Sequence, residues 1–251
     1  KFVPRDYWEI HGTFAAKAGE YQGRWFDEKF AKKDGDEQAR AERIWEIARA
    51  EEVQKKCLGK TGVVTEESKP TTSMSPLLYD LTSLQRDANS RFGFSAKNTL
   101  GLAQALYEKH KVLTYPRTDS RALPEDYINT VKDTLKMLGG VTGYSTFADQ
   151  ILKGGWVHPN KRIFNNAKVS DHFAIIPTML APKSLSEPEQ KLYDLVTKRF
   201  LAIFYPAAEF LETNRITRVE GEPFKSAGKV LVSPGWLTVY GKQSDSDETP
   251  S

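Results

Sequence analysis

Apolar and polar residues alternate along both ends of the chain, which is the pattern of strands that bury one face. Near the start, Trp8, Ile10 and Phe14 fall on alternate positions. Beyond Pro206, strand-like segments are separated by turn residues, and together they predict a β-meander. The strands predicted in this way cover residues 2–14, 21–26, 63–68, 210–219, 224–232 and 236–240.

Apolar residues recur at helical spacing through the middle of the chain, where capping residues mark the starts of helices. Asp80 and Ser95 each precede such a stripe, and Gly93 suits the turn between them, so a helix-turn-helix-like pair is predicted over 80–110. A capping-box pattern at Ser186 begins a later helix. The predicted helices cover residues 37–57, 80–93, 95–110, 124–138 and 186–204.

The order of strands, then helices, then strands predicts an α+β fold. An antiparallel β arch domain, formed by residues 1–75 and 206–251, is interrupted by a mainly helical domain of residues 76–205 that contains the helix-turn-helix-like unit. The polar residues after Gly241 are expected to be disordered or a linker. Because the chain begins at Lys1 and ends in this polar run, we expect a fragment of a larger protein.

The composition is that of an ordinary soluble chain, and it excludes several classes of protein. Of 251 residues, 39% are hydrophobic and 27% are charged, and no stretch approaches the roughly 18 apolar residues of a membrane span. Cys57 is the single cysteine, which excludes an internal disulfide and fits a reducing compartment. No cluster of histidine and cysteine has the spacing of a zinc site, so no structural metal is expected.

The net charge of +3 is too small to identify a partner, but basic residues cluster locally. One group brackets Gly93, a second brackets Tyr115 and a third precedes His172. Groups of this size are usually solvated surface, although three of them beside the suspected chemistry favour a partner with a phosphate backbone. The groups are Arg86, Arg91 and Lys97; Lys109, Lys111, Arg117 and Arg121; and Lys161, Arg162 and Lys168.

The segment from Leu113 to Asp126 carries the most specific chemical pattern. Tyr115 precedes a proline, which pushes its backbone away from the helical region and towards an extended conformation. Arg117 tends to lie on the same side of an extended chain, where a guanidinium can bind a phosphate and favour a phenolate. The pair suggests phosphoryl chemistry, whereas a lone Tyr-Pro-Arg tripeptide is more often a half-buried aromatic beside a surface charge.

Three longer motifs follow one another along the chain. They are Tyr79-Asp-Leu-Thr-Ser-Leu-Gln85, Leu113-Thr-Tyr-Pro-Arg-Thr-Asp-Ser-Arg121 and Ser170-Asp-His-Phe-Ala-Ile-Ile-Pro-Thr178. Together they resemble the type IA DNA topoisomerases and, within that family, the bacterial topoisomerase III branch. The likeness extends over nearly the whole chain. It implies the second and third of four domains arranged in a ring, namely a β arch and the tyrosine-bearing domain.

The resemblance implies an enzyme in which Tyr115 attacks a phosphodiester of single-stranded DNA. A 5′-phosphotyrosine link forms, a strand is passed, and the break is resealed without ATP, so that negative supercoils are relaxed or DNA is decatenated. Arg117 would bind the phosphate, and His172 would bind it too or transfer a proton. No nucleotide-binding motif is present, and we expect a monomer in the bacterial cytoplasm, associated with the nucleoid.

The cofactor implied by the resemblance is Mg²⁺. The acidic Mg²⁺ cluster of that family lies on an N-terminal domain that has no counterpart in these residues. We therefore expect Mg²⁺ in the full-length enzyme, no metal ligand in this chain, and no relaxation activity from this chain alone.

Six further residues are candidate DNA contacts. Thr118 and Ser120 could donate to DNA phosphates or cap the helix near Pro124, and Asp119 could orient Arg117 through a salt bridge. The basic candidates, which could follow the DNA backbone or be solvated charges, are Lys161, Arg162 and Lys168.

Two other classes of protein compete with this interpretation. One is a non-enzymatic DNA-binding module that uses the helix pair over 80–110. The other is a tyrosine recombinase or a relaxase, which also form phosphotyrosines. Recombinases need several arginines and histidines around the tyrosine, and relaxases need a histidine triad, but the four histidines of this chain are scattered. The second class is therefore disfavoured.

Overall fold

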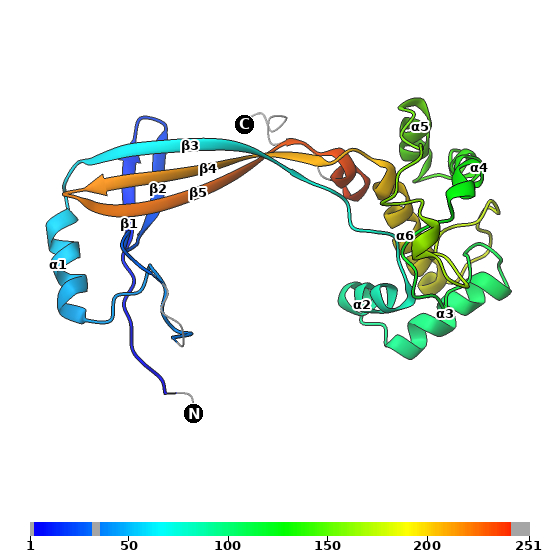
Figure 1. Cartoon of the computed structure of the whole chain (residues 1–251), viewed down its shortest axis with the longest axis horizontal. Coiled ribbons are helices and arrows are strands. Elements are labelled where there is room, and N and C mark those ends of the chain that lie inside the picture. The colour runs from blue at the N-terminus through cyan, green and yellow to red at the C-terminus, as the bar shows by residue number, and fades with distance from the viewer. Residues whose placement is uncertain (1–2, 32–35, 242–251) are drawn as a thin grey trace. The chain divides into compact units, whose positions relative to one another are not determined.

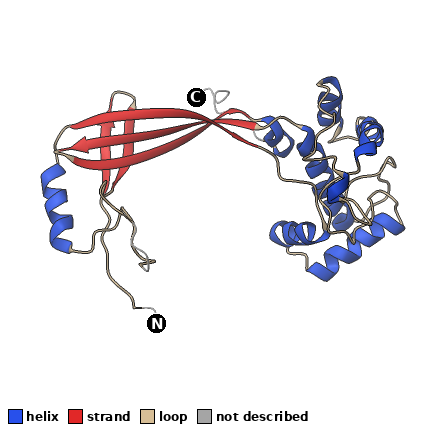
Figure 2. Cartoon of the chain, viewed as in Figure 1, coloured by secondary structure: helices blue, strands red, loops and turns tan. Residues whose placement is uncertain are grey.

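The computed structural model describes residues 3–31 and 36–241. The chain divides into two compact units, of which the first is rich in strands and the second in helices (Figure 2). The predicted α+β class is therefore confirmed, while the tail expected to be disordered lies outside the described residues. We call the units the sheet unit, residues 1–71 and 210–230, and the helical unit, residues 72–209 and 231–251.

One five-stranded sheet is the basis of the sheet unit (Figure 1). Its strands are β1 (His11–Ala16), β2 (Gly19–Trp25), β3 (Gly62–Ser73), β4 (Ala208–Val219) and β5 (Glu222–Ser233). The order across the sheet is β1-β2-β5-β4-β3, so β2 neighbours a strand that lies far away in sequence. Both described pairings of β2 are antiparallel. Tyr21 of β2 lies opposite Phe14 of β1, and Trp25 of β2 lies opposite Phe224 of β5.

Five of the six predicted strands are found, but two of these five were predicted with the wrong extent. β3 continues to Ser73, beyond the predicted end at residue 68, because it lies beside β4 at the edge of the sheet. The strand predicted over 2–14 begins only at His11. Before that point Trp8 makes a single β-bridge to Ile44.

The charged helix predicted over 37–57 forms only in its second half, as α1 (Ile47–Cys57). Ile44, which falls within the predicted helix, exchanges two backbone hydrogen bonds with Trp8, of 2.8 and 2.9 Å. These bonds hold Ile44 in an extended bridge and delay the start of the helix. The core of the sheet unit is small and consists of Trp25, Ile44, Ala50, Val53, Val219 and Phe224.

Helices of the helical unit follow the predicted capping signals closely. The described helices are α2 (Leu81–Phe92), α3 (Ala96–Glu108), α4 (Ile128–Leu138), α5 (Ser145–Lys153) and α6 (Glu187–Phe204), with 3-10 turns η1 (Glu125–Tyr127) and η2 (Asn166–Lys168). The Asp80 carboxylate accepts a hydrogen bond from the N–H of Ser83 at 2.8 Å, which caps α2. Gly93 ends that helix at a φ of +70°, a conformation that glycine adopts without strain.

The segment predicted as the third strand of the meander, 236–240, is instead a 3-10 helix, η3 (Gly235–Tyr240), so that prediction is wrong. Trp236 and Tyr240 pack against the core of the helical unit. The indole N–H of Trp236 also donates to the carbonyl of Ser73 at 2.8 Å. Because of this packing, η3 belongs to the helical unit rather than to the arch, where it was expected.

α6 is the centre of the helical unit and is buried on most sides. The chain around residues 112–123 and 174–176 packs into the same core.

α5 was not predicted, because it has only nine residues and no side-chain cap, yet Ala148 and Ile151 bury it against this core. None of the described helices is long and apolar enough to cross a membrane.

Candidate active site

Three stretches that are far apart in sequence meet in the helical unit and form the frame of the site. They are joined by isolated β-bridges, in which Tyr79 pairs with Ile175, Leu113 with Pro177, and Leu123 with Phe164. All six of these residues are buried. The three sequence motifs quoted above therefore lie side by side and hold one another through the backbone.

Thr114 joins the segment before Tyr115 to the segment after His172. Its hydroxyl donates to the carbonyl of Ala174 at 3.0 Å and accepts from the amide of Ile176 at 2.9 Å. The amide of Thr114 also donates to the carbonyl of Ile176 at 3.0 Å. These bonds fix the point at which the tyrosine leaves the core. Thr114 was not predicted as a site residue, because a short sequence does not distinguish a bridging hydroxyl from an exposed one.

Tyr115 is half-buried and its ring contacts two other rings. The ring centroid lies 4.2 Å from that of His172, with the planes tilted by 38°. It lies 5.3 Å from the ring of Tyr107 in a T-shaped contact, with 76° between the planes. The structure therefore brings together two of the three predicted catalytic residues. Tyr107 of α3 was missed, and the available signal was an aromatic side chain off the apolar stripe of its helix.

Arg117, the third predicted catalytic residue, is exposed. Its side chain forms no hydrogen bond or ion pair with any residue that the structure describes. The salt bridge expected from Asp119 is absent from the described contacts, so that prediction is wrong. Asp119 is exposed as well, and two charges in water gain little from pairing. The guanidinium is thus available to an anion.

Thr118 and Ser120 are buried and use their hydroxyls inside the protein. The hydroxyl oxygen of Thr118 accepts from the amide of Ser120 at 3.1 Å. The Ser120 hydroxyl donates to the carbonyl of Lys168 at 2.7 Å and accepts from the amide of Ala122 at 3.2 Å. The alternative that they cap the helix near Pro124 is wrong, since no side chain caps η1. Instead, Ser120 ties the tyrosine segment to η2.

The three basic candidates beyond the tyrosine segment lie in different surroundings. Lys161 is exposed and forms an ion pair with Glu125. Arg162 is half-buried and donates to the carbonyl of Ser75, and its burial lowers the pKa of its guanidinium. The ammonium of Lys168 is exposed and has no ion pair among the described residues. Arg162 therefore serves the protein's own backbone, whereas Lys168 keeps an unpaired charge.

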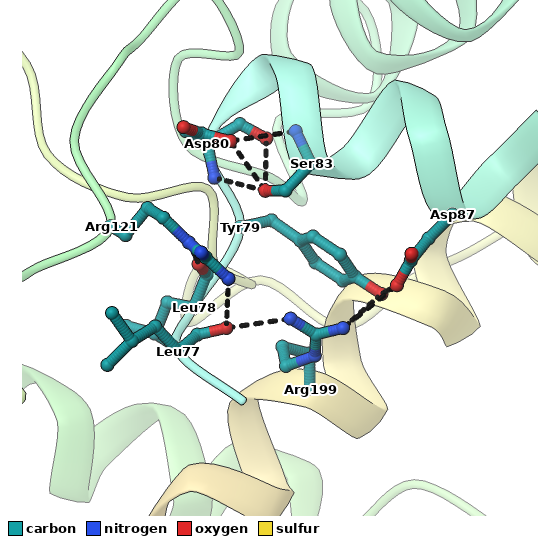
Figure 3. Close-up of polar contacts among 8 residues, drawn as sticks. All are labelled: Leu77, Leu78, Tyr79, Asp80, Ser83, Asp87, Arg121 and Arg199. Atoms are coloured by element: carbon teal, nitrogen blue, oxygen red, sulfur yellow. Dashed lines mark hydrogen bonds and ion pairs between the residues drawn. The ribbon is translucent and has the colours of Figure 1, made fainter. Parts of the chain in front are cut away.

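Two arginines hold the segment that leads into the first motif (Figure 3). Nε of Arg121 donates to the carbonyl of Leu78 at 2.9 Å, and Nη2 donates to that of Leu77 at 3.3 Å. Arg199 of α6 donates to the same Leu77 carbonyl at 2.8 Å. Because Arg121 ends the tyrosine motif, these bonds attach that motif to the chain just before α2.

Arg199 is buried and also joins Tyr79 to Asp87 (Figure 3). Its Nη2 donates to the Asp87 carboxylate at 2.8 Å and to the Tyr79 hydroxyl at 3.1 Å. The Tyr79 hydroxyl donates to the same carboxylate oxygen at 2.6 Å. Burial raises the pKa of Tyr79 and outweighs the opposite effect of the Arg199 charge. Tyr79 therefore stays a neutral, structural phenol.

The described residues contain no group of three or more His, Cys, Asp or Glu side chains that could hold a metal ion. A hollow of about 1090 Å³ lies in the sheet unit, and Tyr115 does not line it. The site is instead a half-buried phenol in contact with an exposed imidazole, two residues from an unpaired guanidinium. These groups can bind a phosphate and move a proton.

Comparisons with known proteins agree on one family. A family model described as DNA topoisomerase matches residues 1–251. Over 193 residues, the chain is 51% identical to DNA topoisomerase 3 of Bacillus subtilis strain 168 and 50% identical to DNA topoisomerase 3 of Bacillus licheniformis. Each alignment covers 76% of this chain and 26% of the relative, so the match spans about a quarter of the relatives' length.

A solved structure shows the same fold. Full-length topoisomerase I from Thermotoga maritima matches 100% of this chain with a TM-score of 0.64, and the match covers 38% of that protein. The sequence identity is 22%, so this likeness is evidence of the fold alone.

Proposed function

Because this chain belongs to the DNA topoisomerase family, and to its type IA class, we propose that it carries the nucleophile of an enzyme similar to topoisomerase III. The proposed nucleophile is Tyr115. The observation that carries the proposal is the contact between its ring and that of His172, beside the unpaired guanidinium of Arg117. These residues come from two motifs that the backbone bridges join.

The proposed reaction is a displacement at phosphorus. The phenolic oxygen of Tyr115 bonds to the phosphorus of a DNA phosphodiester, and the bond from phosphorus to the 3′ oxygen of the preceding nucleotide breaks. The phenol loses its proton and the leaving 3′ oxygen gains one. One phosphodiester bond replaces another, so the reverse reaction reseals the strand without ATP.

His172 is proposed to bind the phosphate or to move the phenolic proton. A phenol has a pKa of about 10, so it needs a base or a cation nearby to react at neutral pH. An imidazole can exchange a proton near neutral pH. The exposed imidazole of His172 lies against the Tyr115 ring, which supports either role.

Arg117 is proposed to hold the attacked phosphate. A guanidinium offers two parallel donors to phosphate oxygens and offsets the charge that develops during the displacement. The side chain of Arg117 is exposed, and it is unpaired within the described part of the chain, which supports this role. Lys168 is also exposed and has no ion pair with a described residue, so it is the best supported of the further DNA contacts. We assign Thr118 and Ser120 to shaping the segment instead.

The proposed substrate is single-stranded DNA, and the whole enzyme would relax negative supercoils or decatenate DNA as a monomer in the bacterial cytoplasm. Affinity for DNA should fall as salt rises, because basic side chains displace counterions from phosphates. The family implies Mg²⁺, but the described residues do not fit a Mg²⁺ site, since no cluster of acidic side chains comes together. No step is therefore assigned to the metal, and we propose that this chain alone does not relax supercoiled DNA.

The test is a Tyr115→Phe variant of the full-length protein, incubated with a single-stranded oligonucleotide labelled at its 3′ end. After denaturation the 3′ label should remain on the wild-type protein, because tyrosine is linked to the 5′ phosphate of the fragment that carries the 3′ end. The variant should bind the oligonucleotide at low salt but retain no label. Tyr7→Phe is the control, because Tyr7 is an exposed tyrosine of the sheet unit.

Two outcomes would overturn the proposal. A labelled adduct that persists in Tyr115→Phe would assign the nucleophile to another residue. Binding without any adduct in the wild type would favour the alternative, a non-enzymatic DNA-binding module on α2 and α3. Nothing observed in those two helices favours that alternative over the tyrosine site.

A further inference from the structure

Tyr107 is an exposed aromatic residue that the proposed mechanism does not use. It lies one residue before the end of α3, and 38% of its surface is exposed. Its hydroxyl forms no hydrogen bond with any residue in the described ranges. Its ring makes a T-shaped contact with the ring of Tyr115, with 5.3 Å between the centroids. A large aromatic side chain is thus held at the surface beside the nucleophile.

The backbone on both sides of Tyr115 is already constrained. Thr114 is fixed by its hydrogen bonds to Ala174 and Ile176, and Pro116 has a fixed φ and is buried. The remaining freedom of Tyr115 is rotation about its side-chain bonds, which swings the phenolic oxygen through space. The rings that border this rotation are those of His172 and Tyr107.

We propose that Tyr107 is a positioning residue that limits the rotation of the Tyr115 side chain and so aims its phenolic oxygen at the phosphate. The inference rests on the proposed function of Tyr115. An edge-to-face contact of this kind favours one ring orientation over others. Reaction rates depend on the fraction of time that the attacking atom is aligned with its target. Tyr107 acts through its ring, because its hydroxyl has no described partner.

A different role for Tyr107 makes a different prediction. An exposed ring could stack on a base of single-stranded DNA, in which case its loss would weaken binding. A positioning residue affects the rate of strand cleavage and leaves the affinity for DNA unchanged. The rate of the chemical step and the dissociation constant must therefore be measured separately.

The experiment uses the full-length protein with Tyr107→Leu, Tyr107→Phe and a matched control, Phe147→Leu. Phe147 makes a T-shaped contact with Tyr205, at 6.5 Å and 70°, which does not involve Tyr115. Single-turnover cleavage of a 3′-labelled oligonucleotide gives the rate of adduct formation. Equilibrium binding of the same oligonucleotide is measured in a Tyr115→Phe background, so that cleavage cannot interfere. Thermal unfolding of each variant checks that it is folded.

Tyr107→Leu should slow cleavage about two- to tenfold, which is the size expected for loss of one aromatic contact. Its dissociation constant should be unchanged, and Tyr107→Phe should cleave at nearly the wild-type rate. Four results would overturn the inference. Tyr107→Leu could cleave at the wild-type rate, or Tyr107→Phe or Phe147→Leu could be slowed as much as Tyr107→Leu. A weakened affinity for DNA could also account for the whole loss of rate in Tyr107→Leu. An adduct that persists in Tyr115→Phe would instead overturn the proposed function, so the two failures are distinguishable.

Discussion

Replacing Thr114 with valine tests whether the frame beneath the nucleophile is built as the structure indicates. Valine has nearly the same shape as threonine but lacks the hydroxyl, so Thr114→Val removes two hydrogen bonds and adds no bulk. The carbonyl of Ala174 loses its donor and the amide of Ile176 loses its acceptor. Both residues are 0% exposed, so water cannot replace the missing partner without local opening.

The size of the effect follows from these two orphaned groups. Each buried polar group left without a partner costs about 1–3 kcal/mol. We therefore expect Thr114→Val to lower the local free energy of opening by about 2 kcal/mol or more. A change of about 2 kcal/mol corresponds to roughly a thirtyfold change in an equilibrium constant.

Hydrogen exchange of the amide of Ile176 is the appropriate assay. The chain has two units with separate cores, so a single unfolding transition would mix them. Exchange measured on the peptide that contains Ile176 reports the affected segment alone. We expect about a thirtyfold loss of protection in Thr114→Val and little loss in Thr114→Ser, which keeps the hydroxyl. Cleavage by the full-length enzyme should slow in the same order.

Unchanged protection of Ile176 in Thr114→Val would refute the reasoning. It would mean that the two hydrogen bonds do not hold the frame in solution. Lost protection without slower cleavage would keep the structural account but show that the position of Tyr115 does not depend on this frame.

Two further predictions concern buried charges. Arg199→Met removes the cation that pairs with the Asp87 carboxylate and one of the two donors to the Leu77 carbonyl, so that Asp87 keeps only the Tyr79 hydroxyl and Leu77 only Arg121. Because Asp87 is partly exposed, we expect the helical unit to lose about 2–3 kcal/mol in urea unfolding. An unchanged transition would contradict the network. Burial raises the pKa of Glu222, but hydrogen bonds from Trp25 and Lys56 and the charge of Arg49 outweigh it, so the pKa lies below the ordinary 4.5. A depressed carboxylate pKa contributes stability above the ordinary value that is lost as pH falls through the folded value. Glu222→Gln should therefore lower the free energy of unfolding of the sheet unit at pH 7. It should also make that free energy depend less on pH between 7 and 3, which hydrogen exchange over this pH range would measure.

Local signals predicted most elements of the helical unit. The caps at Asp80, Ser95 and Ser186 act on amides within three residues, so the sequence carries the whole interaction. Predictions failed where a distant partner competes with local preference. Ile44 has helical spacing but is held by Trp8, and Trp236 has strand-like neighbours but packs on the helical core.

The candidate site divides in the same way. Tyr115, Arg117 and His172 could be named from the sequence, because their motifs are specific and the chemistry of a phenol, a guanidinium and an imidazole belongs to the residue type. Which hydroxyls and charges remain free could not be named. Arg117 and Arg162 look alike in sequence, yet Arg162 donates to a backbone carbonyl, whereas the side chain of Arg117 has no partner among the described residues.

What the sequence determined by itself was the repertoire of helices, strands and reactive side chains, since propensity, capping and motif chemistry act over a few neighbouring residues. What only the tertiary structure decided was which of these groups touch. Thr114 meets Ala174 across 60 residues of chain, and Tyr115 meets both Tyr107 and His172. Such contacts are formed by the packing of the whole helical core around α6, and no local pattern encodes them.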